Sequence, residues 1–400
     1  MTGARLRTIE DLGGLEGKRV FVRADLNVPL DGRTVSDDLR IKAALPSLAE
    51  LREGGAALIL ASHLGRPRGK PSDELMLEPV RERLQELGGF EVRPLGGPTG
   101  EEARSASESL AAGEVGLLEN LRFDPGEEAN DPSFAQDLAS SANAYVGDAF
   151  GAAHRAHASV VGVAELLPSG AGRLMQKEIE ILSRLLESPK SPFVAILGGA
   201  KVSDKLGVID SLVERVDALL VGGAMAFTFL AAQGAETGDS LVEEERLDDV
   251  RRSLKRADEL GVPILLPEDV VAAAEISMDA RQQTVPANAV PKGLKGLDIG
   301  PHTVEEFTRV LSDARTVFWN GPMGVFELEP FAQGTRGVAH AVAAIDAFTV
   351  VGGGDSVAAI RQLGFEHQVD HLSTGGGASL EFLEGRTLPG VEVLMERTDG

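Results

Sequence analysis

The chain has 400 residues, and because a single hydrophobic core stops growing near roughly 250–300 residues, more than one domain is expected. Its formal net charge of −23 argues against nucleic acid or an anionic membrane as a partner, and no run of lysine or arginine offsets that charge. The absence of cysteine excludes disulfides, zinc–thiolate sites and thiol nucleophiles.

The N-terminal stretch MTGARLRTIEDLGG lacks the apolar core of a signal peptide. No apolar run approaches the roughly 18–20 residues that a membrane span needs. We therefore expect a cytoplasmic protein that acts on small molecules. Since the overall charge repels anions, any anion site must be a local cluster of basic residues.

Short apolar runs alternate with longer helical patterns along the whole chain. The runs that predict strands cover 19–23, 56–62, 116–119, 144–148, 193–197, 218–221, 263–266, 316–319 and 348–351. The helical patterns cover 39–51, 77–87, 206–216, 247–260 and 304–311, and Thr303 with Glu306 has the spacing of a capping box for the last of these. This alternation predicts an α/β fold with parallel sheets that carry helices on both faces.

The pattern breaks between residues 168 and 192. There LPSGAGR is followed by a charged helical stretch at 175–187 and then by SPKSP. We interpret the break as the boundary between two doubly wound, Rossmann-like domains joined by an interdomain helix and hinge, with residues 1–184 in the first and 185–387 in the second. One large sheet is the alternative, which the chain length disfavours.

Polar side chains follow the predicted strands of the first half, at the edge where open α/β sheets bind ligands. The segments RADLNVP, SHLGR, ENLRF and DAFGAAHRAH contribute Arg23, Asp25, Asn27, His63, Arg66, Arg122, Asp148, His154, Arg155 and His157. Arg40 lies in the first turn of a helix that Ser36 or Asp37 could cap, where a cation opposes the helix dipole. Each arginine alone is consistent with a surface ion pair, but together they predict a site for a small polyanion.

The segment GGAKVSDKL, at 198–206, follows the predicted strand at 193–197. If a helix starts near Ala200, Lys201 and Lys205 share one face and repel each other, and an anion at the helix start would relieve that repulsion. The segment is not the phosphate loop of NTPases, because no Gly-Lys pair in the chain is followed by serine or threonine. Two solvated surface lysines are the alternative.

Glycine-rich turns follow the strands of the second half, in VGGAMAF, WNGPMGVFE, VGGGDS and STGGGA. Such turns let a phosphate approach backbone N–H groups, and Asp355 beside one of them suits Mg²⁺. A single cluster is best explained as a tight turn, whereas several at one sheet edge predict a nucleotide site. A small-anion site in one domain and a nucleotide site in the other predict phosphoryl transfer, which depends on positioning and charge neutralisation.

Eight segments recur in the order and spacing of one known family: RVFVRADLNVPL, ASHLGRP, LLENLRF…GEE, DAFGAAHRAHAS, LGGAKVSDKL, WNGPMGVFE, GGGDS and STGGGA. Together they resemble the phosphoglycerate kinase family over essentially the whole chain. The resemblance implies a glycolytic and gluconeogenic enzyme, usually monomeric, that uses Mg²⁺ to transfer a phosphoryl group reversibly from 1,3-bisphosphoglycerate to ADP, giving 3-phosphoglycerate and ATP. It also implies that about residues 388–400 complete the first domain, and that the domains close to exclude water.

The resemblance further implies a role for individual residues. The implied 3-phosphoglycerate site comprises Asp25, Asn27, Arg40, His63, Leu64, Gly65, Arg66, Arg122 and Arg155. The moving phosphoryl group would be stabilised by Arg40, Lys201, Lys205 and the backbone N–H groups of Gly375, Gly376 and Gly377. The implied nucleotide site comprises Lys205, Gly296, Glu327, Gly353, Gly354, Asp355 and Ser356, with Asp355 as the Mg²⁺ ligand.

Four positions depart from the family's usual pattern. Ser356 stands where threonine is commoner, Ala152 replaces a threonine, Gly147 replaces an asparagine, and Arg173 lies where a bulky apolar residue is expected. None removes a proposed catalytic group. The rival interpretations are a hinge-closing anion receptor, a dehydrogenase, which the missing G-x-G-x-x-G fingerprint disfavours, and a kinase for another small carboxylic or phosphorylated acid.

Overall fold

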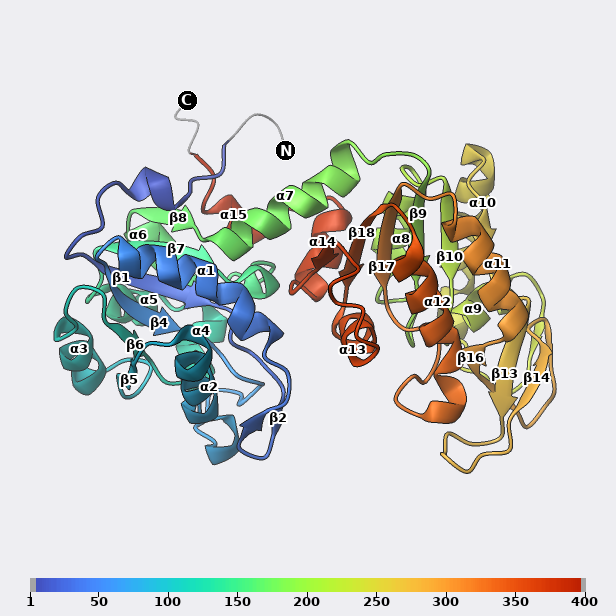
Figure 1. Cartoon of the computed structure of the whole chain (residues 1–400), viewed down its shortest axis with the longest axis horizontal. Coiled ribbons are helices and arrows are strands. Elements are labelled where there is room, and N and C mark those ends of the chain that lie inside the picture. The colour runs from blue at the N-terminus through green and yellow to red at the C-terminus, as the bar shows by residue number, and fades with distance from the viewer. Residues whose placement is uncertain (1–4, 397–400) are drawn as a thin grey trace. The chain divides into compact units, whose positions relative to one another are not determined.

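The computed structural model describes residues 5–396, which divide into two compact units (Figure 1). Unit 1 comprises the described residues up to Glu180 together with those from Thr387 onward, and unit 2 comprises Ile181–Arg386. The division falls inside helix α7 (Arg173–Glu187), the same helix that contains the boundary predicted after residue 184. Within residues 5–396, no helix is both long and apolar enough to cross a membrane.

Unit 1 is built on a six-stranded parallel sheet with the order β5-β6-β4-β1-β7-β8. Its strands are β1 (Arg19–Ala24), β4 (Ala57–Ala61), β5 (Val92–Pro94), β6 (Val115–Leu117), β7 (Ala144–Asp148) and β8 (Ser169–Ala171). All five residues of β4 are buried, as expected for a parallel strand covered on both faces. The chain enters at β1 in the middle of the sheet and later returns to β1's other side at β7, so the strand order reverses there.

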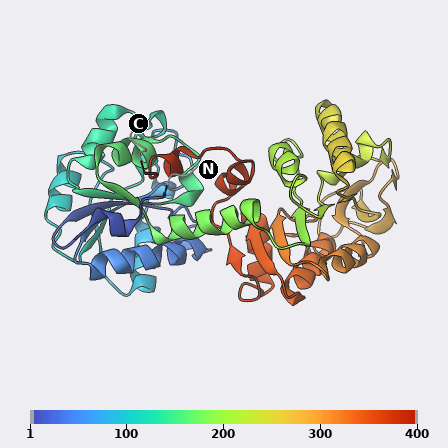
Figure 2. The ribbon, with the colours of Figure 1, turned by 90° about the horizontal axis from the view of Figure 1, so that it is seen from above.

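Helices cover both faces of the unit 1 sheet (Figure 2). The helices are α1 (Leu39–Glu53), α2 (Glu78–Gly88), α3 (Glu101–Glu108), α4 (Pro125–Ala129), α5 (Pro132–Ala139), α6 (Val163–Leu166) and α15 (Pro389–Glu392), and a small hairpin pairs β2 (Leu30–Asp31) with β3 (Thr34–Val35). The described C-terminal segment packs on this unit, since the Gly390 N–H donates to the Ala153 carbonyl at 2.8 Å and the Arg7 N–H donates to the Leu394 carbonyl at 2.9 Å. Residues 397–400 of the segment expected here lie outside the described residues.

Unit 2 repeats the same architecture with the strand order β12-β10-β9-β17-β18-β19, again all parallel. Its strands are β9 (Phe193–Leu197), β10 (Ala218–Val221), β12 (Ile264–Leu265), β17 (Thr316–Asn320), β18 (Phe348–Gly352) and β19 (His371–Leu372). Its helices are α8 (Leu206–Leu212), α9 (Ala226–Ala232), α10 (Leu247–Leu260), α11 (Pro301–Leu311), α12 (Gln333–Ala344), α13 (Gly354–Gln362) and α14 (Gly377–Leu383). The two parallel sheets confirm the predicted doubly wound α/β class.

Unit 2 also contains a smaller antiparallel sheet that the sequence did not predict. Strands β13 (Asp269–Ala273), β14 (Gln283–Pro286) and β16 (Lys295–Ile299) form it in the order β14-β13-β16, and β11 (Glu236–Thr237) pairs with β15 (Ala289–Val290) beside it. A core of its own supports this sheet, with Phe227 and Leu230 of α9 packed against Val270, Ala272 and Val290.

The predicted capping box at Thr303 and Glu306 is wrong. Helix α11 begins at Pro301 with Gly300 as its N-cap, so Thr303 already lies inside the helix. Proline at the first helical position needs no N–H partner, which explains the earlier start. The Thr303 hydroxyl instead donates to the Asp269 carboxylate at 2.7 Å, and Glu306 pairs with Arg309.

Candidate active site

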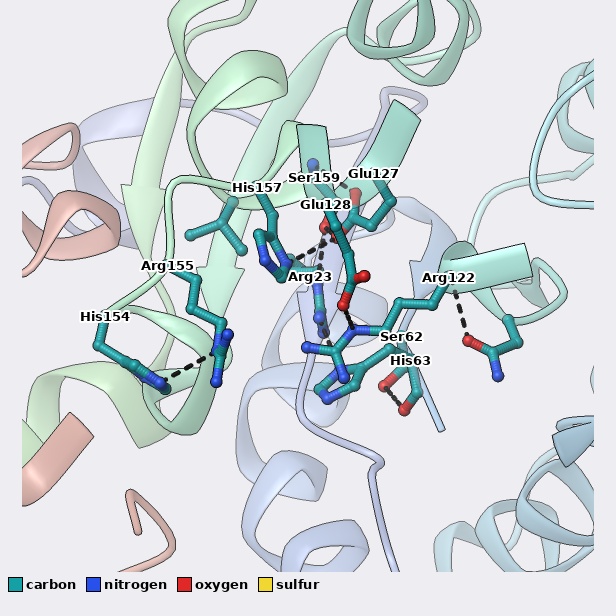
Figure 3. Close-up of polar contacts among 12 residues, drawn as sticks. Arg23, Ser62, His63, Arg122, Glu127, Glu128, His154, Arg155, His157 and Ser159 are labelled. Atoms are coloured by element: carbon teal, nitrogen blue, oxygen red, sulfur yellow. Dashed lines mark hydrogen bonds and ion pairs between the residues drawn. The ribbon is translucent and has the colours of Figure 1, made fainter. Parts of the chain in front are cut away.

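A buried arginine organises the carboxyl edge of the unit 1 sheet (Figure 3). Arg23, near the end of β1, has only 1% of its surface exposed and donates from Nε to the Ser159 Oγ at 2.8 Å. Ser159 in turn donates to the Glu127 Oε1 at 2.6 Å, and the other Glu127 oxygen accepts the Ser159 N–H at 3.0 Å. The arginine charge is thus balanced through a serine by a carboxylate that is itself fully buried.

This arginine also fixes the state of His63, which follows β4. The Arg23 Nη2 donates to the His63 Nδ1 at 2.9 Å, so that nitrogen is the acceptor and the ring proton sits on Nε2. Burial, followed by the charges of Arg23, Arg122 and Arg40, lowers the pKa of His63 well below its usual value. His63 is therefore a neutral hydrogen-bond donor at neutral pH, a role suited to an anionic oxygen.

The pKa of His157 responds to the same concentration of positive charge. Its ring is buried, and burial together with the nearby Arg122, Arg23 and Arg155 lowers the pKa of His157 to about 4. Two neutral histidines beside several arginines mean that positive charge is concentrated at this edge, although the whole chain is strongly acidic.

A chain of contacts joins five of the predicted substrate residues. The Arg40 Nη1 donates to the Asp25 Oδ1 at 3.1 Å and to the Asn27 carbonyl at 3.2 Å. The Asn27 side chain accepts the Gly65 N–H at 2.9 Å, and the Gly65 carbonyl accepts from the Arg122 Nη1 at 2.8 Å. The ends of β1 and β4, helix α1 and the segment after β6 are thereby linked at the edge where the strand order reverses.

Local structure explains how Arg40 and Arg122 are presented. Helix α1 begins at Leu39, whose N–H donates to the Asp37 carboxylate at 2.8 Å, so Arg40 lies in the first turn as predicted. Arg122 is buried, which lowers its pKa, and its Nε lies 3.3 Å from a carboxylate oxygen of Glu128. Asn120 orients this segment by accepting the N–H groups of Leu64 and Arg122.

Four predicted substrate residues lie outside this chain of contacts: His63 and Leu64, which contact Arg23 and Asn120, and two arginines. Arg66 and Arg155 are exposed, and within the described part of the chain no hydrogen bond or ion pair joins either to Arg40 or Arg122. The Arg155 Nε donates to the His154 Nε2 at 3.2 Å (Figure 3). Arg155 is nevertheless close enough for its charge to lower the pKa values of Arg122 and His157.

The lysine segment of unit 2 differs from its prediction. Helix α8 begins at Leu206 with Lys205 as its N-cap, so Lys201 precedes the helix and the two lysines do not share a helix face. Gly199 has a φ of +103°, and the turns that follow it delay the helix start. Lys205 donates to the Asn320 Oδ1 at 2.8 Å, bridging β9 and β17 at the point where the unit 2 strand order reverses, and Lys201 is exposed.

The environment of Lys205 is chemically distinctive. Burial lowers the pKa of the Lys205 ammonium, and the charges of Asp204 and Asp355 oppose that shift. The amide of Asn320 is buried and accepts from the ammonium with its oxygen, which fixes the position of the charge. A bound phosphate would stabilise the charged form of Lys205, which burial disfavours.

The glycines of unit 2 fall into two groups. A Cβ at Gly198 would lie 2.2 Å from the Pro322 carbonyl oxygen, and one at Gly223 would lie 2.5 Å from the Gly199 nitrogen. Glycine is therefore needed at both positions because two loops cross there in close contact. In contrast, a Cβ at Gly354 would meet nothing within 4 Å, so the fold does not require glycine there. A Cβ at Gly376 would also have open space, but the φ of +54° favours glycine at that position.

A cavity of about 370 Å³ brings several predicted nucleotide residues together. Its lining includes Gly296, Glu327 and Asp355 together with the apolar side chains of Leu241 and Ile276. A Cβ at Gly296 would lie 2.0 Å from the Phe227 ring, so glycine here is needed for packing as well. An apolar cavity with a few polar groups at its rim fits a flat heterocycle with a charged tail.

The remaining predicted residues lie at two helix starts. Asp355 is in the first turn of α13, and the buried Ser356 hydroxyl accepts the Gly321 N–H at 2.5 Å, which ties this turn to the end of β17. Helix α14 starts at Gly377 with Gly376 as its N-cap, and the Gly375 N–H donates to the Ser373 Oγ at 3.2 Å.

Sequence reasoning assigned no role to Glu127, Ser159, Asn120 or Asn320. All four lie inside segments quoted for the family resemblance, so their position could have drawn attention to them. Their function, however, is to hold other side chains through contacts between residues as many as 136 positions apart, which no local pattern reveals.

Comparison with known proteins gives a consistent result. A family model described as phosphoglycerate kinase matches residues 9–386. The phosphoglycerate kinase of Thermus thermophilus is 58% identical over 391 residues, covering 97% of this chain and 100% of the relative, and that of Moorella thermoacetica is 56% identical over 390 residues, covering 98% and 99%. The solved phosphoglycerate kinase of Coxiella burnetii is 41% identical with a TM-score of 0.85, covering 98% of this chain and 99% of that one, and the one from Pyrococcus horikoshii is 35% identical with a TM-score of 0.85, covering 97% and 98%.

Proposed function

This chain belongs to the phosphoglycerate kinase family, and from that premise we propose how its two units divide one reaction between them. The reaction is the reversible transfer of a phosphoryl group from 1,3-bisphosphoglycerate to ADP, giving 3-phosphoglycerate and ATP in glycolysis and gluconeogenesis. Family membership removes the rival anion receptor and dehydrogenase.

We assign the phosphoglycerate ligand to residues 1–184 with 388–400. The observation that carries this assignment is the concentration of positive charge there, which keeps His63 and His157 neutral. The phosphate and carboxylate of the substrate each accept paired N–H donors from arginine forks. The proposed ligand contacts are made by Asp25, Asn27, Arg40, His63, Leu64, Gly65, Arg66, Arg122 and Arg155.

We assign the nucleotide to residues 185–387. The base and ribose occupy the cavity beside Gly296 and Glu327, and the phosphates approach Lys205 and the turn at Gly353, Gly354 and Ser356. The half-buried ammonium of Lys205 supports this assignment, because a phosphate stabilises the charged form that burial disfavours.

The site also fits Mg²⁺ in the manner of other phosphoryl-transfer enzymes. Among the described residues no three His, Asp or Glu side chains gather to hold a metal by themselves, and Asp355 is exposed at the cavity. One carboxylate plus substrate phosphates is how Mg²⁺ commonly binds, so Asp355 would hold it together with the nucleotide. The ion would supply charge neutralisation on the phosphate oxygens.

Transfer itself needs little covalent chemistry from the protein, because both reacting oxygens belong to substrates. The charge on the moving phosphoryl group is neutralised by Arg40, Lys201, Lys205 and the N–H groups of Gly375, Gly376 and Gly377. The units approach each other during turnover, which excludes water that would hydrolyse the acyl phosphate. We further propose that the enzyme is a cytoplasmic monomer.

A coupled assay tests this proposal directly. Folded protein is mixed with 3-phosphoglycerate, Mg²⁺ and ATP, and an added dehydrogenase consumes NADH as the acyl phosphate forms. We expect turnover that depends on every component, including Mg²⁺. Replacing 3-phosphoglycerate with acetate, and following the release of ADP instead of NADH consumption, tests the rival carboxylate kinase. Turnover with acetate but not with 3-phosphoglycerate, or with neither, would refute the assignment.

A further inference from the structure

Unit 1 contains a cavity that the proposed reaction does not use. It measures about 540 Å³ and lies at the carboxyl ends of β5 and β6, beside α2. Its walls are mostly apolar and include Met76, Leu77, Pro94, Leu117, Leu118 and Phe123. The volume falls within the range of roughly 300–1,000 Å³ that is typical of small-molecule sites, and no residue assigned to either substrate lines it.

Acidic side chains outnumber basic ones in the lining of this cavity. Arg81 is the single basic side chain in the lining, and Glu78 already neutralises it with two hydrogen bonds of 2.9 and 2.6 Å. The third guanidinium nitrogen donates to the Val92 carbonyl at 2.9 Å. The other two acids in the lining are Glu119 and Asp124, and within residues 5–396 neither forms an ion pair.

Glu119 is held firmly in place at the cavity wall. Its Oε1 accepts the Leu77 N–H at 2.8 Å and the Asn120 N–H at 2.7 Å. Its Oε2 accepts no hydrogen bond from any described residue. Burial raises the pKa of this carboxyl, because the charged form lies against apolar walls without a counter-ion.

We propose that this cavity binds a small organic cation, namely an amine with an apolar body. Its ammonium group donates to the Glu119 Oε2, and its apolar body packs against Met76, Leu118 and Phe123. A cation supplies the counter-ion that the carboxylates lack, while an anion such as either substrate is repelled. The occupant therefore belongs to a chemical class different from that of the substrates.

The test uses the full-length protein with two probes of nearly equal size, 2-phenylethylamine and 2-phenylethanol, titrated by calorimetry and by saturation-transfer NMR. The amine should bind at least about tenfold more tightly than the alcohol, because a charge-assisted hydrogen bond contributes that much or more. Neither 3-phosphoglycerate nor ADP should displace it.

Two variants separate the roles of charge and wall. Glu119→Gln keeps an oxygen that accepts both N–H groups and should abolish the preference for the amine, whereas Glu108→Gln, at the exposed end of α3, makes the same change in net charge and should not. Met76→Ala removes an apolar wall at a partly exposed position and should weaken amine and alcohol alike.

Several results would overturn the proposal. They are no binding of the amine, equal binding of the two probes to the unmodified protein, an amine preference that survives Glu119→Gln, or displacement of the amine by a substrate. The comparison of probes on the unmodified protein decides the matter even if a variant fails to fold. Because this test measures binding and not turnover, its outcome is separable from that of the coupled assay.

Discussion

Both units place their candidate site at the carboxyl edge of a parallel sheet, but the groups that form the two sites differ. In unit 1 the site is made of charged side chains that other side chains hold in place, as Glu127 holds Arg23 through Ser159. In unit 2 it is made largely of backbone at glycine turns, with one half-buried ammonium at Lys205. A small, highly charged acid demands directed side-chain forks, whereas the phosphates of a nucleotide can be held by N–H groups that any backbone supplies.

This contrast predicts that the largest single loss comes from unit 1. Arg40→Ala should lower kcat by about a thousandfold, because a guanidinium aimed at developing phosphoryl charge contributes on the order of several kcal/mol. ADP affinity, measured by calorimetry, should stay nearly unchanged. The matched control is Arg33→Ala, which removes an exposed arginine from the β2–β3 turn and should leave kcat intact. An unchanged kcat in Arg40→Ala would contradict the role of this residue.

Removing the ammonium from unit 2 should act on binding first. Lys205→Ala should weaken ADP binding about ten- to a hundredfold in calorimetry, since it deletes a charge-assisted contact to phosphate. Asn320→Ala should weaken it less, because that change displaces the ammonium without removing it. Lys292→Ala, at an exposed position between β15 and β16, is the control. Equal ADP affinity in Lys205→Ala and the unmodified protein would mean that backbone alone holds the phosphates.

Acid should destabilise the protein through the buried histidines of unit 1. The unfolded chain protonates histidine near pH 6.5, whereas folded His157 stays neutral down to about pH 4, so between these values the unfolded state binds more protons and stability falls as the pH falls. At pH 5 the loss from His157 should be about 2 kcal/mol relative to neutral pH. His63 adds a loss of the same sign.

Urea unfolding at pH 7.5 and pH 5 measures this effect. In His157→Gln the difference in unfolding free energy between the two pH values should shrink by about 2 kcal/mol. The comparison of two pH values in one variant removes any constant cost of the substitution. An identical pH dependence in His157→Gln and the unmodified protein would show that His157 is not kept neutral.

The sequence predicted the fold where burial is uniform. The strands at 144–148, 193–197 and 218–221 and the helix at 247–260 have the expected bounds, because each strand is a fully buried apolar run and the helix has a strong amphipathic pattern. Strands β5, β8 and β19 were missed because they are short and their sequences, VRP, SGA and HL, do not form an apolar run. The antiparallel sheet was missed because β14 is mostly exposed and carries little apolar signal.

For the candidate site, residues next to strand ends could be named and their supports could not. Arg40 and Arg122 could be predicted because Arg40 lies just after a helix start and Arg122 lies after a strand end. The start of α8 was misjudged because the turn after Gly199 is irregular and leaves no periodic signal. The bonds of Arg23 and Lys205 depend on tertiary approach, so only coordinates reveal them.

Arg173, the departure from the family pattern at the start of α7, gives the smallest expected effect. Its Nε and Nη2 donate to the two carboxylate oxygens of Glu50 on α1, at 2.6 and 2.5 Å, and its Nη2 also contacts Glu10 of the turn at Ile9–Leu12. Arg173 therefore joins three segments of unit 1 by ion pairs where an apolar contact is usual. About a third of each of the Arg173 and Glu50 side chains is exposed, so water and salt screen the pair.

We therefore expect Arg173→Leu to lower the free energy of unfolding by only about 0.5–1 kcal/mol in urea at low salt, because exposed ion pairs contribute little. The difference should fade near 1 M NaCl, and kcat should stay within about twofold, since within residues 5–396 no hydrogen bond or ion pair joins Arg173 to a proposed substrate residue. Glu50→Gln should match it, and the double variant should cost less than the sum of the two. A tenfold fall in kcat at unchanged stability would instead make this contact part of the catalytic cycle, because a purely local ion pair acts on stability alone.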